Sequence, residues 1–339
     1  MLNRRRWLSA AAAAAAGSGW AALAMPAAAQ GLQNLPGAKP SPRVIAWPKL
    51  DIYIPAGAGG GWDQTGRSLG AALQAGALVK DIAYENKGGK GGTIGLAEFG
   101  PRHAKNANVL FVSGLVMVGA LALNQTPEAI KQLTPIARLT SDTMVLCVAP
   151  GKGPQTLAEL TAALRKDAGS VSFTGGSAGG VDHMLAAMVL RVLGVDAGAM
   201  KYLPTASGKE ALDMLASGQA QVAISGYSEF KAGIQDKSLL PLAVSSRKGL
   251  FGIASLREQD VDTELANWRG VFAPAGISAA QKDSLRKLVI AATETPQWRQ
   301  ALADNNWQGA LLYGKELDNY IEQQQGVATI VAGLLKLKR

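Results

Sequence analysis

The chain has 339 residues, of which 48% are hydrophobic and 17% are charged, which is typical of a globular protein long enough for two domains. Its formal net charge is +9, but the positive residues are spread along the sequence, which argues against a nucleic-acid-binding surface. A single cysteine excludes an intrachain disulfide, and two separated histidines give no metal-ligand spacing, so we expect no metal and no other cofactor.

The first 29 residues have the pattern of an export signal. Arg4–Arg6 precede an alanine-rich stretch, and Ala27–Ala29 matches the small-residue cleavage pattern. The adjacent arginines resemble a twin-arginine signal, with the Sec route as the alternative. We therefore predict a signal peptide over residues 1–29 and a periplasmic mature protein.

Short apolar runs alternate with helical segments from residue 50 onward, which predicts an α/β fold with a mostly parallel sheet. In chain order the pattern predicts strand 50–54, helix 62–76, strand 82–85, helix 92–99, strands 109–113 and 143–149, helix 156–167, strand 171–174, helix 181–193, strand 199–203, helix 207–217, strands 221–225, 241–245 and 268–274, and helices 278–292, 296–304 and 314–335.

The two series of alternating elements predict two α/β lobes joined by crossing strands, with a hinged cleft between them. We expect the first lobe to be discontinuous and to cover residues 30–138 and 247–339. The second lobe then covers residues 139–246. Each lobe is expected to be a sheet flanked by helices.

Two glycine-rich loops each lie between a predicted strand and a predicted helix, at Pro55–Asp63 and at Lys87–Thr93. Glycine permits positive φ and lets backbone N–H groups approach a ligand closely. A helix N-terminus adds unpaired N–H donors and a partial positive charge. The pair of loops therefore predicts a binding site for an anion such as a carboxylate or a phosphate.

A third glycine-rich segment, Thr174–Gly180, contains a G-x-S-x-G pattern centred on Ser177 between a strand and a helix. This context is that of a hydrolase nucleophile, so a serine hydrolase is the alternative from a different class of protein. A triad of that type needs a histidine well downstream of the serine. His103 precedes Ser177, and His183 lies in the helix that follows directly, which argues against catalysis.

Taken together, these segments resemble the receptors of tripartite tricarboxylate transporters, a periplasmic solute-binding family that includes the Bordetella uptake-gene proteins. The resemblance covers essentially the whole mature chain. The motifs that carry it are Pro55–Thr65, Glu85–Gly92, Phe173–His183 and Trp268–Gly276. It implies a two-lobed Venus-flytrap binding protein of the type II kind, without catalysis.

In that family the two glycine loops of the first lobe hold one ligand carboxylate. Carried over by position, the resemblance implies as ligand-binding residues Gly60, Gly61, Trp62, Asp63, Gly89, Gly91, Gly92 and Thr93. Lys90 replaces the usual small residue and Gly88 the usual proline. Lys90 is therefore either an additional cation beside the ligand or a solvated side chain.

Further candidates are placed by their position at strand ends and helix N-termini. We expect the second lobe to receive a distal carboxylate through its own glycine-rich segment. The candidates are Gly176, Ser177, Ala178, Gly179, Ser207, Ser225 and Tyr227 in the second lobe and Ser113 in the first.

The resemblance implies a small-molecule carboxylate as ligand and the membrane permease subunits of a tripartite transporter as partners. Within it we favour a citrate-like tricarboxylate. The alternatives are a receptor for dicarboxylates or aromatic carboxylates, or a ligand sensor that acts on a sensor kinase. We expect the mature protein to be a monomer.

Overall fold

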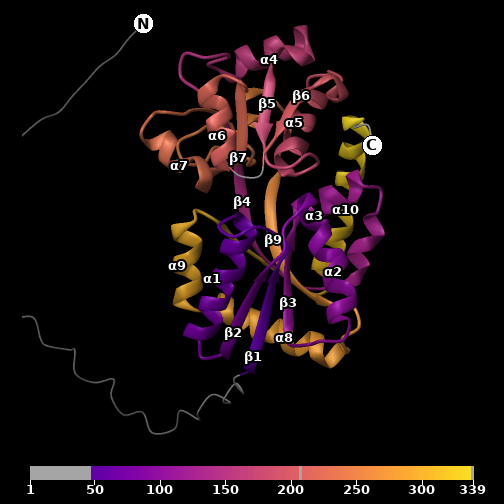
Figure 1. The fold of residues 1–339 in the computed structure, drawn as a ribbon. Coiled ribbons are helices and arrows are strands. Elements are labelled where there is room, and N and C mark those ends of the chain that lie inside the picture. Colours follow the sequence, from indigo (N-terminus) through magenta and orange to yellow (C-terminus); the bar gives the residue numbers. More distant parts are fainter. Residues whose placement is uncertain (1–46, 206–207, 337–339) are drawn as a thin grey trace, which may run out of the picture. The chain divides into compact units, whose positions relative to one another are not determined.

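The computed structural model describes residues 47–205 and 208–336, all of which belong to the unit Val44–Arg339 (Figure 1). The predicted signal peptide and the candidate Ser207 lie outside the described residues. No helix in the described part of the chain is long and apolar enough to cross a membrane.

The first sheet has the strand order β2-β1-β3-β9-β4, with β10 also paired to β4. β1 is parallel to both β2 and β3, whereas β9 is antiparallel to β3 and to β4. The strands are β1 (Trp47–Ile54), β2 (Val79–Asn86), β3 (Val109–Gly114), β4 (Leu133–Val148), β9 (Ala266–Pro274) and β10 (Gln308–Leu312).

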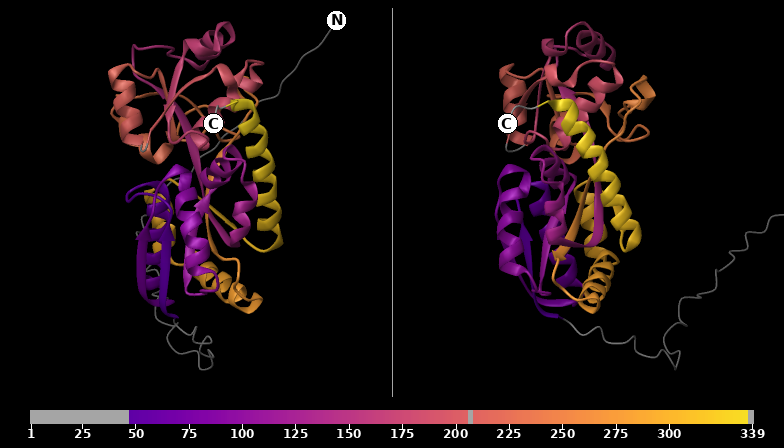
Figure 2. Two further views of the ribbon diagram at one scale, coloured as in Figure 1. Left: turned by 45° about the vertical axis from the view of Figure 1, so that its right-hand side comes forward. Right: turned by 90° about the vertical axis from the view of Figure 1, so that its right-hand side faces the viewer.

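Helices flank this sheet and, with it, form what we call the first lobe. The chain moves from β1 to β2 and back past β1 to β3, so right-handed crossovers place α1 and α2 on opposite faces. α1 packs against α8 and α9, and α3 packs against α10 (Figures 1 and 2). The helices are α1 (Gly61–Ala75), α2 (Thr93–His103), α3 (Leu115–Leu123), α8 (Ala279–Thr293), α9 (Pro296–Asp304) and α10 (Lys315–Leu335).

The second sheet continues from the C-terminal half of β4, and with its helices it forms the second lobe. β4 pairs with β7 and β8, and β5 lies in parallel between β7 and β6. Its other strands are β5 (Ser172–Gly175), β6 (Lys201–Pro204), β7 (Val222–Gly226) and β8 (Leu240–Val244), and its helices are α4 (Leu157–Lys166), α5 (Val181–Val192), α6 (Gly208–Ser217) and α7 (Tyr227–Gln235).

Short 3₁₀ helices complete the element order of the described residues, and η1 lies in the second glycine loop. They are η1 (Lys90–Gly92), η2 (Pro127–Gln132), η3 (Ala168–Ser170), η4 (Ala197–Ala199) and η5 (Arg257–Gln259).

The two lobes are joined mainly by β4, a strand of 16 residues that pairs with β9 up to Thr143 and with β7 from Met144 onward. α10 also reaches the second lobe, where Lys336 forms an ion pair of 2.8 Å with Asp196. One hydrophobic cluster includes residues of both lobes, and a smaller one lies around α6, α7 and β8. The lobes therefore share part of their core.

The α/β fold predicted from the sequence is confirmed, but the expected mostly parallel sheet is wrong: β4 pairs antiparallel with β7, β8, β9 and β10, and β9 pairs antiparallel with β3. The helices α3 and α7, the strand β10 and the short 3₁₀ helices were not predicted. α3 has the sequence LVMVGALAL and is buried almost throughout, so it shows no amphipathic period. α7 and β10 are short and only partly buried. The segment after β8 returns to it through a bridge between Val244 and Ser255, although the prediction assigned residues 247–339 to the first lobe. The lobe boundaries stay a prediction.

Candidate ligand-binding cleft

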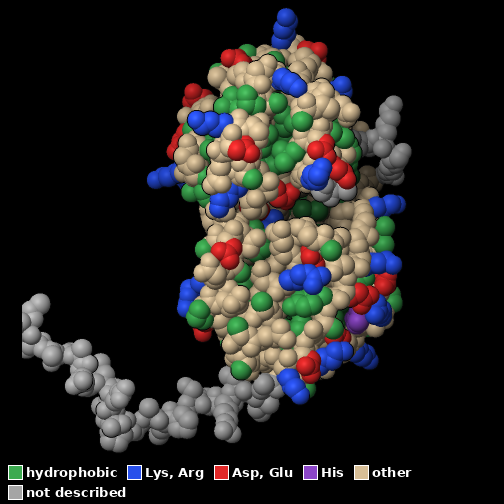
Figure 3. All heavy atoms as spheres, turned by 60° about the vertical axis from the view of Figure 1, so that its left-hand side comes forward, with side chains coloured by type: hydrophobic (Ala, Val, Ile, Leu, Met, Phe, Trp, Pro, Cys, Tyr) green, Lys and Arg blue, Asp and Glu red, His purple; other side chains and the backbone are tan. Residues whose placement is uncertain are grey.

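A cleft of about 1030 Å³ lies between the two lobes and is visible as a groove across the surface in Figure 3. Its walls are formed by the two glycine loops and the N-terminus of α1 on one side. Residues of the loop after β5, of β7 and of α7 form the other side. These segments follow the carboxyl ends of parallel strands, where α/β proteins bind ligands.

A smaller cavity of about 300 Å³ lies between β1, β2 and α2. Its charged side chains pair with one another, as in the ion pairs of Lys49 with Asp51 and of Arg102 with Glu85. It lies away from all three glycine-rich segments, so we take the larger cleft as the candidate site.

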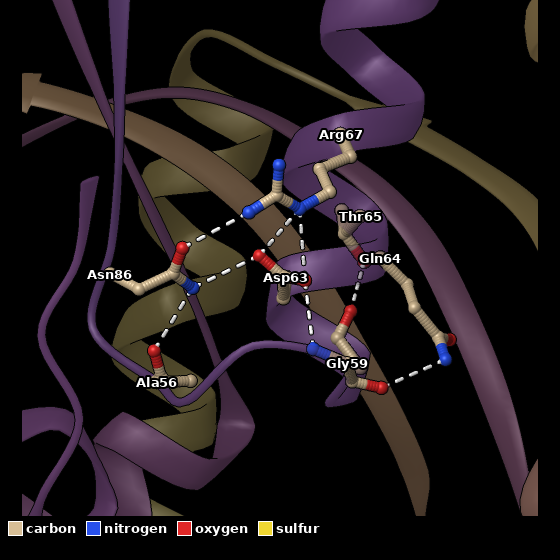
Figure 4. A network of polar contacts seen from close by, with 8 residues as sticks. Ala56, Gly59, Asp63, Gln64, Thr65, Arg67 and Asn86 are labelled. Carbon is tan, nitrogen blue, oxygen red and sulfur yellow. Dashed lines mark hydrogen bonds and ion pairs between the residues drawn. The ribbon is translucent and has the colours of Figure 1, made fainter. Parts of the chain in front are cut away.

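The first glycine loop is fixed from behind by Asp63, in the first turn of α1 (Figure 4). Its carboxylate accepts hydrogen bonds from Gly59 N at 2.8 Å, from Arg67 Nε at 2.9 Å and from Asn86 Nδ2 at 2.9 Å. Burial alone would raise the pKa of Asp63, but these hydrogen bonds hold it below its usual value. Asp63 therefore shapes the loop and does not line the cleft.

The second glycine loop contacts the first directly. A Cβ at Gly88 would lie 2.9 Å from the Gly57 nitrogen, so only glycine fits there without moving the neighbouring loop. The residues of Gly89–Gly92 all have positive φ, including Lys90 at 49°. This backbone path forms a concave surface at the start of α2, next to the N-terminus of α1.

Trp62 connects the two loops and lines the cleft between them. It is 7% exposed, and a Cβ at Gly92 would lie 2.6 Å from its ring. Trp62 thus belongs both to the cleft wall and to the packing under the second loop. This arrangement requires glycine at position 92, where φ is also 90°.

The second lobe presents the loop that carries Ser177. Asp182 Oδ2 accepts a hydrogen bond of 3.0 Å from Gly176 N, and the Tyr202 hydroxyl donates to Gly176 O at 2.9 Å. His183 stacks on Tyr202 with ring centroids 4.0 Å apart. The loop is therefore held by side chains of α5 and β6.

His183 is unsuited to act as the base of a hydrolase. Its Nδ1 accepts a hydrogen bond of 3.0 Å from Gly179 N, which places the ring proton on Nε2. Burial lowers the pKa of His183 to about 4, so the ring is neutral at pH 7. The other histidine, His103, packs against Phe99 in the first lobe and lies outside the cleft lining. No histidine is placed to activate Ser177.

A buried ion pair lies beside the cleft, which Arg269 lines. Arg269 Nη2 contacts Asp142 Oδ2 at 2.8 Å, and both side chains are less than 5% exposed. The guanidinium lies against the start of α1, because a Cβ at Gly61 would be 2.7 Å from Nη2. Glu229 of α7 also lines the cleft and accepts hydrogen bonds from the Ser225 hydroxyl and from Gly208 N.

Comparison with known proteins shows which family this architecture represents. Residues 69–331 match the model of the tripartite tricarboxylate transporter family receptor. The chain belongs to this family. Receptors of this family are periplasmic solute-binding proteins, and neither the family nor the fold is one of enzymes.

Solved structures show the same two-lobed fold as this receptor. The periplasmic binding protein BugD has a TM-score of 0.72 at 22% identity, covering 84% of this chain and 98% of that one. MatC from Rhodopseudomonas palustris with bound malate has a TM-score of 0.70 at 20% identity, with coverage of 84% and 98%. A second R. palustris protein, with adipate, has a TM-score of 0.71 at 20% identity, with coverage of 85% and 97%.

The receptor brings most of the predicted site residues into one cleft. The candidates that line it are Gly60, Gly61, Trp62, Gly89, Lys90, Gly91, Gly92, Gly176, Ser177, Ala178 and Ser225. Their contacts with a ligand stay a prediction.

Five described candidates do not line the cleft: Asp63, Thr93, Ser113, Gly179 and Tyr227. Thr93 Oγ1 donates to Lys90 O at 3.0 Å, and Ser113 is fully buried in β3. Gly179 packs against Leu123 of α3, and Tyr227 stacks on Phe251 at 3.7 Å in the smaller hydrophobic cluster.

The ion pair beside the cleft could not be predicted from the sequence, because Asp142 and Arg269 are far apart in the chain. Thr140 lies opposite Arg269 and Asp142 opposite Asn267 in the antiparallel pairing of β4 with β9. Only this register places the two charged side chains diagonally on one face. The signal that the sequence offered was a charged residue inside each of two apolar strands.

Proposed function

We propose that this receptor captures a small organic acid in its inter-lobe cleft and delivers it to the membrane permease subunits of a tripartite transporter. One observation carries the proposal. Two glycine loops in direct contact line the same cleft, each at a helix N-terminus. We propose the periplasm as the site of capture, reached by twin-arginine or Sec export.

The loops suit a carboxylate because they offer N–H donors without side chains in the way. A hydrogen bond to a charged acceptor contributes about 1.5–3 kcal/mol, so three or four such bonds approach the roughly 8 kcal/mol of micromolar binding. Lys90 lines the same side of the cleft and adds a positive charge there.

The citrate-like tricarboxylate expected from the sequence is one member of this ligand class. Dicarboxylates are the main alternative, and two structural neighbours were solved with the dicarboxylates malate and adipate. Aromatic carboxylates and a sensor-kinase partner remain variants of the same proposal, with the receptor acting as a monomer. The acidic side chains of the second lobe repel carboxylates and therefore favour a ligand with few carboxylate groups.

A ligand held by both lobes would stabilise the closed arrangement, because only that arrangement provides contacts from both sides. The permease subunits would then recognise the closed receptor. Transport energy comes from the permease and not from the receptor.

A thermal-shift screen of the mature protein tests the proposal, with citrate, malate, succinate, adipate and benzoate as probes and glucose and phosphate as controls. Ligand at 100 times its Kd adds about 2.7 kcal/mol of stability, which corresponds to a rise in Tm of about 4 °C for a chain of this length. We expect such a rise with at least one carboxylate and none with glucose. No response to any carboxylate would contradict the proposal.

A further inference from the structure

The two sides of the cleft differ in charge. The first lobe contributes the two glycine loops, Lys90 and Arg269 of β9. The second lobe contributes the carboxyl groups of Asp182, Glu210 and Glu229 and one lysine, Lys209. A second ligand carboxylate on that side would face like charges. The second lobe therefore recognises a different chemical group from the first.

Asp182 is the most informative of these acidic residues, because it lines the cleft and is only 9% exposed. Its Oδ2 accepts the hydrogen bond from Gly176 N, but its Oδ1 has no hydrogen-bond partner among the described residues. Burial, followed by the nearby Glu229, raises the pKa of Asp182 to about 7. A buried acceptor without a partner in a ligand cleft points to a donor on the ligand.

Glu229 and Asn267 line the same cleft as Asp182 and provide further hydrogen-bond acceptors. Glu229 lines the cleft, and burial raises its pKa although Arg269 opposes this shift. Asn267 is 9% exposed, and its Oδ1 also has no partner among the described residues. Two carboxyl groups and one amide oxygen are thus available to a donor.

The cations near these acceptors are already engaged or lie elsewhere. Arg269 forms its ion pair with Asp142 through Nη2 and also opposes the rise in the pKa of Glu229, so it compensates Glu229 only in part. Its Nη1 has no hydrogen-bond partner among the described residues. Lys209 of α6 is 82% exposed and pairs with Asp213 at 2.8 Å. Lys90 belongs to the opposite wall. Within the second lobe, the acidic side chains that line the cleft therefore outnumber the one lysine.

We propose that Asp182, Glu229 and Asn267 bind the ammonium group of a ligand whose carboxylate rests on the glycine loops. The ligand class is then an amino carboxylate with its two charges at opposite ends. This inference rests on the proposed receptor function and specifies its ligand. An ammonium group has three donors, which matches the three side chains, and it compensates the excess negative charge.

Isothermal titration calorimetry of the mature protein tests this with three pairs of probes that have the same number of methylene groups between their charged ends: 4-aminobutyrate and glutarate, 5-aminopentanoate and adipate, and 6-aminohexanoate and pimelate. Each pair differs only in whether one end carries an ammonium or a carboxylate group. We expect at least one amino carboxylate to bind tenfold or more tightly than its partner at pH 7.5.

Two variants assign that preference to the second lobe. Glu229→Gln and Asp182→Asn keep the size of each side chain and remove its charge. We expect each to weaken amino carboxylate binding by tenfold or more and to leave dicarboxylate binding equal or tighter. Glu322→Gln, an exposed residue of α10, is the matched control and leaves both affinities unchanged.

The outcomes separate the two proposals. Dicarboxylates that bind as tightly as, or more tightly than, every amino partner would overturn the ammonium site and leave the receptor function intact. An amino preference that survives both variants would also overturn it. Failure of both classes at every length would overturn the ammonium site and leave the receptor function to the thermal-shift screen with citrate and benzoate.

Discussion

Asp182 shows how one residue links the fold to the cleft. It lies in the first turn of α5, where a negative charge interacts favourably with the helix dipole, and it fixes the loop that carries Ser177 through Gly176 N. Its burial has the opposite effect on the charged form and raises the pKa of its carboxyl to about 7. The residue therefore exchanges a proton near neutral pH.

This predicts a pH dependence of stability that Asp182→Asn removes. The folded protein binds the proton more tightly than the unfolded chain, whose carboxyl has a pKa of 3.8. The stabilising contribution is therefore present at low pH and is lost as the pH rises from about 4 through about 7, at up to roughly 1.4 kcal/mol per pH unit.

Urea unfolding at pH 5 and pH 8 measures the effect. We expect the free energy of unfolding of the wild type to fall more between these values than that of Asp182→Asn, by at least about 1 kcal/mol. Equal pH dependence in the two proteins would show that Asp182 titrates normally.

At the scale of elements, the glycine loops are local structures, and this is why they could be predicted from the sequence. A glycine run between a strand and a helix needs no distant partner to specify its backbone. The contact of Gly88 with Gly57 follows from the parallel pairing of β1 with β2, which brings the two strand ends together. The elements missed were those whose pattern is uniform or short, such as α3.

Gly91→Ala tests whether the backbone path of the second loop is required for binding. Gly91 has a φ of 65°, and a Cβ there would lie 2.7 Å from the Cβ of Ala120. We expect carboxylate affinity to fall tenfold or more by calorimetry, with a loss of about 1–2 kcal/mol in stability.

Gly326→Ala is the matched control for this variant. Gly326 lies in α10 with no atom within 4 Å of the added Cβ, so alanine should be neutral or slightly stabilising there. Unchanged affinity in Gly91→Ala would show that the loop is only a structural turn.

At the scale of the whole molecule, the pairing of β4 with β9 places two charged residues beside the cleft. β4 carries Asp142 just before the point where its pairing passes from β9 to β7. The neighbouring strand β9 carries Arg269. The ion pair of Asp142 with Arg269 thus depends on the register between two strands that are far apart in sequence. No local sequence pattern specifies that register. The α/β alternation and the glycine loops could be predicted, whereas this ion pair and the acceptors of the second lobe could not.

The most direct test of the account is a nuclear magnetic resonance titration of the mature protein labelled with ¹⁵N-glycine. Succinate, adipate and citrate would be added in turn, and the probe with the largest thermal shift would be followed to saturation. We expect the amides of Gly60, Gly61 and Gly91 to shift on binding, because the proposal has them donate to the carboxylate. Gly194 and Gly218, which face open space, should not move. Saturable binding that leaves the loop glycines unshifted would contradict the central claim.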